Sequence, residues 1–298
     1  MAERIGFVGV GFMGHGMAKN LLAKGYPVAV LGHRNRAPVD DLIKRGATEA
    51  RSAQELAATT DIVFLCVTGS PQVEAVVAGA DGVLAGARPG LLVVDCSTSE
   101  PDSTTRLRNL AAQARVRFID APLARTPVEA EAGKLNVMVG AEAGEFARIE
   151  PLLRCFAENV FHVGGPGAGH TIKLLNNFIA QAICTATAEA FAVGQKAGID
   201  LRKLVELVSA GVVNSGLFQA MAKTLSGDMA GLKFELDNAR KDIRYYTHMA
   251  ENLAVPSVVG EAVHQSLALA SALGYGRKFV PSLVEAQEKL TGAQIVGR

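Results

Sequence analysis

The chain has 298 residues, of which 49% are hydrophobic and 20% charged, and its formal net charge is +1. This length predicts one large or two medium-sized domains. The near-neutral charge gives no indication of the strongly basic balance that is typical of proteins binding nucleic acid or anionic membranes, so we expect neither partner. The low share of charged residues indicates extra buried area, in a long core helix or in a subunit interface.

The four cysteines lie far apart, each within an apolar run, and the six histidines are also scattered. Because no CxxC pair and no Cys/His ligand spacing occurs, we expect free thiols in a reducing compartment and no metal site. The apolar stretch near the N-terminus is broken by glycines and is not followed by a signal-peptide cleavage pattern. These features predict a cytoplasmic protein.

A short apolar run at residues 4–8 leads into a glycine-rich turn and then into helical spacing that ends at Gly25. A strand, a GxGxxG turn and a helix in this order are the context of a dinucleotide-binding site. In such a site the glycines allow the tight turn, the approach of a pyrophosphate and close helix packing. We expect the cofactor to lie on Gly9, Val10, Gly11, Phe12, Met13 and Gly14, with a purely structural turn as the alternative.

The next apolar run, residues 27–31, ends in the sequence GHRNR. An acidic residue at this point would bind the ribose hydroxyls of NAD. Here His33, Arg34 and Arg36 stand instead, and guanidinium groups bind phosphate well. This basic loop favours the 2′-phosphate of NADP over NAD, unless it is merely a solvated loop.

Continuous apolar runs at 61–67, 91–97, 116–122 and 134–140 alternate with helical patterns near 71–78, 102–114 and 142–156. Such runs are typical of parallel strands that are buried on both faces. We therefore expect an α/β, doubly wound parallel sheet over residues 1–163, with ligands at the carboxyl ends of its strands. The segments 67–72, 97–101 and 120–126 follow strands, although turn chemistry would also explain their composition.

Residues 164–298 show helical patterns and no strand pattern, which predicts a second, all-helical domain. The segment from Gly164 to Ala197 is a glycine-rich loop followed by a long helix, and residues 174–188 carry no charge. We expect this helix to be buried nearly all round. It is not expected to span a membrane, because polar residues interrupt it. Further along, Asp200 is positioned to cap a short helix that ends at Gly211.

Lys173 stands in the first turns of this apolar helix, and Asn176 and Asn177 follow on the same side. The helix dipole and burial would both lower the pKa of such an amine. Taken alone, a lysine that reaches back to solvent would explain the position. A pocket that holds an amine and two amides is the functional alternative.

Together, five motifs resemble the β-hydroxyacid dehydrogenase family, which includes 3-hydroxyisobutyrate dehydrogenases and tartronate semialdehyde reductases. They are residues 9–21, 96–101, 120–122, 167–177 and the pair Lys241 and Asp242. The resemblance implies a Rossmann domain followed by a helical domain built on the long helix, a substrate cleft between the two, and a homodimer or homotetramer. It also implies hydride exchange between NADP(H) or NAD(H) and a small hydroxyacid or semialdehyde.

The resemblance also assigns roles to individual residues. Lys173 matches the catalytic lysine, with Asn177 and its neighbour Asn176 as substrate-orienting amides. Thr98 matches a residue beside the nicotinamide ring, and Val67, Thr68 and Lys241 match residues along the cofactor. In reduction Lys173 would donate a proton to the carbonyl oxygen, and in oxidation it would accept one.

The substrate motif departs from the family pattern. The usual DAPVSGG is here DAPLART, so that Ala124 replaces a serine while Arg125 and Thr126 replace two glycines. A guanidinium in place of neutral donors predicts a strong or large anion on the substrate, such as a carboxylate, sulfonate or phosphate. Sulfolactaldehyde reductases carry a similar Arg-Thr pair. The alternative is that Arg125 points to solvent.

Two rival functions remain from the sequence. A non-catalytic nucleotide-binding scaffold would not need the lysine, and imine reductases of similar architecture usually lack it. The presence of Lys173 argues against both.

Overall fold

The computed structural model describes residues 2–297, and these form two compact units, Met1–Lys173 and Leu174–Arg298. The two units meet within one continuous helix, α9 (Ala168–Lys196). The domain boundary expected at residues 163/164 stays a prediction.

Within the described residues, the strands of the first unit form a nine-stranded sheet. Its members are β1 (Ile5–Val8), β2 (Val28–Leu31), β3 (Thr48–Ala50), β4 (Ile62–Leu65), β5 (Leu92–Asp95), β6 (Arg117–Asp120), β7 (Leu123–Ala124), β8 (Leu135–Gly140) and β9 (Ala157–Gly164). The strands β3-β2-β1-β4-β5-β6 are parallel neighbours in that order, which is the Rossmann arrangement. The predicted fold class is confirmed.

The far edge of the sheet differs from the sequence prediction. The strand β8 runs antiparallel to β6 and β7, while β9 runs parallel to β8. The short β3 and β7, and the half-exposed β9, were not expected as strands. They are short or lack a continuous apolar run, and it is pairing with a neighbour that makes them strands.

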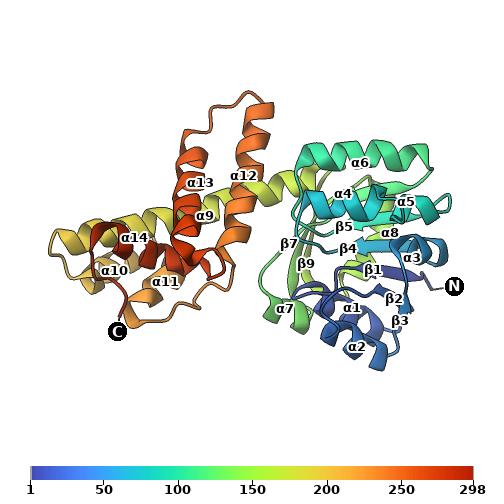
Figure 1. The fold of residues 1–298 in the computed structure, drawn as a ribbon, viewed down its shortest axis with the longest axis horizontal. Helices are drawn as coiled ribbons and strands as arrows, with labels where there is room; N and C mark the ends of the chain where they lie inside the picture. The colour runs from blue at the N-terminus through green and yellow to red at the C-terminus, as the bar shows by residue number, and fades with distance from the viewer. Residues whose placement is uncertain (1, 298) are drawn as a thin grey trace. The chain divides into compact units, whose positions relative to one another are not determined.

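Helices cover both faces of this sheet (Figure 1). Their bounds are α1 (Gly14–Ala23), α2 (Ala37–Lys44), α3 (Ala53–Thr59), α4 (Ser70–Ala78), α5 (Val83–Gly86), α6 (Pro101–Gln113), α7 (Pro127–Ala132) and α8 (Ala143–Leu153). One apolar core lies between the strands and α1, α2, α7 and α8, and a second lies between the strands and α3 to α6. Burial on both faces explains why the strand sequences are continuous apolar runs.

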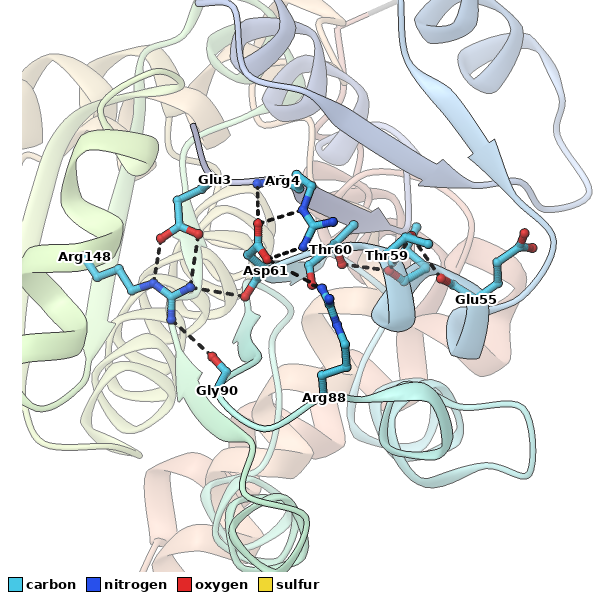
Figure 2. A network of polar contacts seen from close by, with 10 residues as sticks. Glu3, Arg4, Glu55, Thr59, Thr60, Asp61, Arg88, Gly90 and Arg148 are labelled. Carbon is cyan, nitrogen blue, oxygen red and sulfur yellow. Dashed lines mark hydrogen bonds and ion pairs between the residues drawn. The ribbon is translucent and has the colours of Figure 1, made fainter. Parts of the chain in front are cut away.

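At the amino ends of β1, β4 and β5, ion pairs and hydrogen bonds join chain segments that are far apart in sequence (Figure 2). The backbone N and Nε of Arg4 each donate to Asp61 Oδ2 at 3.0 Å, and Nη2 donates to Oδ1 at 2.7 Å. Arg148 from α8 donates to Glu3 Oε1 at 2.8 Å and to Gly90 O at 3.4 Å. The glycine-rich turn follows the opposite end of β1, so this network has a structural role.

The second unit is helical. Besides the greater part of α9, it contains α10 (Leu201–Ser209), α11 (Gly216–Ala222), α12 (Leu236–Asn252), α13 (Val258–Ala270) and α14 (Leu283–Thr291). Among residues 165–297, the only β pairing is an isolated bridge between Glu235 and Phe279. Asp200 caps α10 by accepting a hydrogen bond from Arg202 N at 2.9 Å, as predicted.

One expectation about α9 was wrong, namely that the helix is buried nearly all round. Ile172, Leu175, Ile179 and Val193 expose between 37% and 64% of their surface in the single chain. Their spacing of three, four and fourteen residues places them on one side of the helix. The apolar sequence of α9 was interpreted as burial within one chain. In the structure, the rest of the chain does not cover this apolar stripe. In the described part of the chain, no helix combines the length and hydropathy needed to cross a membrane.

Candidate active site

The glycine-rich turn has the backbone geometry that a dinucleotide needs. Gly9 has a φ of +94°, and a Cβ at this position would lie 2.2 Å from Cys66 O. A Cβ at Gly14 would lie 2.0 Å from Gly9 O, so that the start of α1 packs against the turn only because both residues are glycine. A Cβ at Gly11, in contrast, would meet no atom within 4 Å. The turn thus leaves open space at Gly11, next to the amides of a helix N-terminus, and fits a pyrophosphate.

The segments that follow β4 and β5 join this turn at the same edge of the sheet. Val67 N donates to Ser97 Oγ at 3.0 Å, and Glu100 N donates to Ser70 Oγ at 2.8 Å. Since β1, β4 and β5 are parallel neighbours, the fold places the glycine-rich turn, Val67, Thr68 and Thr98 side by side. Thr98 is half-buried and Thr68 is exposed.

The basic loop after β2 divides into two parts. Arg36 is held by two carboxylates, since Nη1 lies 2.5 Å from Glu49 Oε1 and Nη2 lies 3.0 Å from Asp40 Oδ1. The hydrogen bond from Arg36 lowers the pKa of Glu49. His33 and Arg34 are exposed. Sequence reasoning missed Glu49, because it comes from the next strand rather than from the loop itself.

The substrate motif places Arg125 between β7 and α7 in a left-handed conformation, with a φ of +83°. This conformation favours glycine and strains other residues by about 1–3 kcal/mol. Arg125 Nη1 donates to Glu158 Oε2 at 2.5 Å and to Lys134 O at 2.6 Å. Arg125 is nevertheless an exposed residue and this is a surface ion pair, so the anion contact and the solvent-facing alternative both stay predictions. Thr126 begins α7 with a capping box, in which its backbone N donates to Glu129 Oε2 at 2.9 Å.

The start of α9 is attached to the end of β6 by Asp120. Gly167 N donates to Asp120 Oδ1 at 2.5 Å, and His170 N donates to Oδ2 at 2.7 Å. These bonds satisfy amides that a helix N-terminus otherwise leaves unpaired, and α9 accordingly begins at Ala168. Burial raises the pKa of Asp120, while the charge of His170 and the two amides oppose that rise. Lys173 follows His170 by three residues and is half-buried.

The glycines around Asp120 leave room for its carboxylate. A Cβ at Gly140 would lie 2.6 Å from Asp120 Oδ1, and one at Gly169 would lie 2.5 Å from Met138 O. Sequence reasoning included residue 120 in a strand-end segment and in the motif at residues 120–122, but gave it no role of its own. The available signal was a charged residue at the end of a continuous apolar strand.

In the second unit, the predicted amide and lysine share one carboxylate. Asn177 Nδ2 donates to Asp242 Oδ2 at 2.6 Å, and Lys241 Nζ lies 3.1 Å from Asp242 Oδ1. Asn176, which is exposed, donates through Nδ2 to Asn177 Oδ1 at 3.2 Å. Asp242 thus fixes the orientation of the Asn177 amide. The sequence motif contained Asp242, but its role follows only from this contact.

Two family models match the chain. The NAD binding domain of 6-phosphogluconate dehydrogenase matches residues 4–164, and the NAD-binding domain of NADP-dependent 3-hydroxyisobutyrate dehydrogenase matches residues 167–285. The first model alone spans more than half of the chain. The matched ranges contain all of the site residues described above.

Curated proteins and solved structures are similar over nearly the whole length. The chain is 32% identical to 2-(hydroxymethyl)glutarate dehydrogenase of Eubacterium barkeri over 99% of this chain and 98% of that protein. It is 30% identical to 3-sulfolactaldehyde reductase of Escherichia coli K12 over 94% of each. The structure of Psf3 in complex with NADP+ and 2-OPP matches with a TM-score of 0.79 and 26% identity, over 94% of this chain and 99% of that one. The chain therefore belongs to the β-hydroxyacid dehydrogenase family and is an NAD(P)-dependent oxidoreductase that acts on a CH–OH group.

Proposed function

We propose that this enzyme interconverts a small anionic hydroxyacid and the corresponding semialdehyde, with Lys173 as the general acid and base. The attachment of α9 to β6 carries this proposal. Through Asp120, the helix that bears Lys173 begins at the same edge of the sheet as the glycine-rich turn and Thr98. A proton-transfer group is thereby anchored where the fold binds a dinucleotide.

The nicotinamide, when bound, supplies or accepts the hydride. The protein provides the proton: as an ammonium, Lys173 donates to the carbonyl oxygen during reduction, and as an amine it accepts the hydroxyl proton during oxidation. Asn177 orients the substrate by its amide, which Asp242 holds in one direction. Asn176 and Thr98 complete the proposed substrate contacts, and Lys241 contacts the cofactor.

The Lys173 role is tested by steady-state kinetics of K173A and K173R with NADPH and small semialdehyde acids. We expect kcat of K173A to fall by about 10²–10⁴, the usual contribution of a positioned general acid. Because no residue of the glycine-rich turn is changed, the dissociation constant for NADPH should stay within about twofold. Retention of most of the wild-type turnover by K173A would refute the assignment. Absence of turnover in the wild type would favour a scaffold, and turnover of cyclic imines alone would favour an imine reductase.

For the cofactor, we propose NADP with His33 and Arg34 on the 2′-phosphate. The GHRNR loop contains no acidic residue, and the side chains of His33 and Arg34 are exposed. Arg36 is not proposed for this contact, because it is paired with Glu49. Charge-assisted hydrogen bonds contribute about 1.5–3 kcal/mol, so R34A should lower kcat/KM for NADPH at least tenfold and leave kcat/KM for NADH unchanged. Equal losses for both cofactors would refute this role.

For the substrate, we propose that Arg125 binds the acid group and that Glu158 competes with this group for the guanidinium. The proposal is supported by similarity to enzymes named for a glutarate derivative and for sulfolactaldehyde. E158Q removes the competing charge, so the KM of anionic substrates should fall severalfold, whereas R125A should raise it. R154A is a matched control, because Arg154 forms a comparable surface ion pair with Glu150 on α8. An unchanged KM in both E158Q and R125A would exclude Arg125 from the substrate site.

We also propose that the enzyme is a cytoplasmic homodimer or homotetramer. The exposed apolar stripe on α9, with Leu175, Ile179 and Val193, supports association, and the four free cysteines are typical of a reducing compartment. Light scattering after size exclusion should show a multiple of the 31.2 kDa chain mass. I179E should shift that mass toward the monomer, and a monomeric wild type would refute association through this face.

A further inference from the structure

Two aspartates stand side by side at the carboxyl ends of β5 and β6. Asp95 and Asp120 are partners in the strand register, and both are wholly inaccessible to solvent. Like charges directly opposite each other in a sheet are destabilising, and buried charges need partners. The structure must therefore provide both carboxylates with donors.

Each carboxylate organises the backbone of one functional segment. Asp95 accepts from Ser97 N and from Ser99 Oγ, each at 2.9 Å, and so shapes the loop that carries Thr98. Asp120 accepts from Gly167 N and His170 N and so fixes the first turn of α9. The two segments are far apart in sequence, but the aspartates that bind them stand at the ends of neighbouring strands.

The side chain of His170 joins these two segments. It is wholly buried, with Nε2 3.2 Å from Ser97 O and Nδ1 2.7 Å from Thr104 Oγ1. A carbonyl oxygen can only accept, so Nε2 carries a proton and donates it to Ser97 O. The ring also lies close to both carboxylates, with Nε2 3.7 Å from Asp95 Oδ2 and Nδ1 3.9 Å from Asp120 Oδ2.

We propose that His170 is a positioning residue that sets the distance between Thr98 and Lys173. Its imidazole holds the carbonyl next to Thr98, while its backbone N–H is bound by Asp120 one helical turn before Lys173. A Cβ at Gly169 would lie 2.5 Å from Met138 O and 2.8 Å from Asp120 Oδ2, so this turn is packed tightly against the sheet where Asp120 binds it. The inference rests on the role proposed for Lys173. A misplacement of about 1 Å in such a constellation costs on the order of 10²-fold in rate.

The test compares H170A, H170Q and H170N. A glutamine amide nitrogen reaches the place of Nε2, whereas an asparagine amide nitrogen reaches only the place of Nδ1. We expect kcat of H170A to fall about 10- to 100-fold, with the dissociation constant for NADPH within about twofold of wild type. H170Q should recover most of kcat because it can donate to Ser97 O, and H170N should not. A purely structural residue would instead lower thermal stability in all three variants without this difference in kcat.

H162Q is the matched control, because His162 also approaches a backbone carbonyl, with Nε2 2.7 Å from Ala141 O, but lies on β9 outside this connection. Its kcat should equal that of wild type. In ¹⁵N-histidine-labelled enzyme, the Nε2–H of His170 should give a slowly exchanging proton signal, and an unprotonated Nε2 would overturn the proposal.

The two proposals fail in different ways. If K173A keeps its turnover, the function assigned to Lys173 is wrong. If K173A loses turnover while H170A keeps the wild-type kcat, only the positioning role of His170 is wrong.

Discussion

The substitution Gly169→Ala tests how tightly the start of α9 is packed on the sheet. A Cβ at this position would lie 2.5 Å from Met138 O and 2.8 Å from Asp120 Oδ2. Neither atom can easily withdraw, since one belongs to the backbone of β8 and the other accepts the hydrogen bond from His170 N. The added methyl must therefore move the first turn of α9 away from the sheet.

The size of the effect follows from two opposing contributions. Alanine is a better helix former than glycine by up to about 1 kcal/mol, and overpacking costs about 1–3 kcal/mol. The backbone contact places this site at the upper end, so a net loss of about 1–2 kcal/mol is expected. For a unit of this size, 1 kcal/mol corresponds to about 2–4 °C in Tm, which gives a decrease of about 2–8 °C.

The assay is thermal unfolding by calorimetry together with kcat at 25 °C. Gly144→Ala is the matched control, because Gly144 is also the second residue of its helix, α8, but a Cβ there would meet no atom within 4 Å. The control should raise Tm or leave it unchanged, with wild-type kcat, whereas G169A should lower both Tm and kcat. A Tm of G169A equal to or above that of G144A would refute the close packing of Gly169 against Met138 O.

Three further changes have expected outcomes. Gly11→Ala should leave Tm unchanged, because its Cβ has free space, and should weaken cofactor binding at least tenfold by filling that space, as measured by NADPH fluorescence titration. The hydrogen bond from Arg4 lowers the pKa of Asp61 to about 2, below its ordinary value of 3.8, so this pair stabilises the fold above pH 4 and the contribution is lost as the pH falls from 4 to 2. Asp61→Asn should therefore remove part of the acid sensitivity of Tm in that range, and an unchanged profile would contradict the pairing. Burial, and to a smaller extent the charge of Asp95, raises the pKa of the Cys66 thiol to about 12. Its alkylation by iodoacetamide at pH 8 should be at least tenfold slower than that of free cysteine, which mass spectrometry of the labelled peptide would measure.

Much of the first unit could be predicted from local patterns. The run before Gly9 and the apolar runs that became β2, β4, β5, β6 and β8 are strands because both faces of the central sheet are covered, so burial is visible in every residue. The glycines at 9 and 14 could be identified because their conformation and close packing depend on neighbours in a strand-turn-helix unit. A strand such as β9, which is half-exposed, gave no comparable signal.

The candidate site could be predicted only in part. The family resemblance indicated Lys173, Asn177 and Thr98 as a set, because their motifs occur in a fixed order along the chain. The partner of Arg125 could not be predicted, since Glu158 stands 33 residues away on a strand that the sequence did not reveal. The guanidinium of Arg125 was expected to bind a substrate anion, whereas in the single chain it binds the carboxylate of Glu158.

The sequence by itself determined the α/β class, the dinucleotide turn and the helical second half, because each depends on residues within about one element of one another. The tertiary structure decided which side chains support Lys173. Asp120 and His170 acquire their roles only because parallel pairing brings the ends of β5 and β6 together and α9 begins against them. It also decided that one face of α9 stays exposed in the single chain. Helical spacing shows which face of a helix is apolar, but only the packing of distant segments determines whether that face is covered.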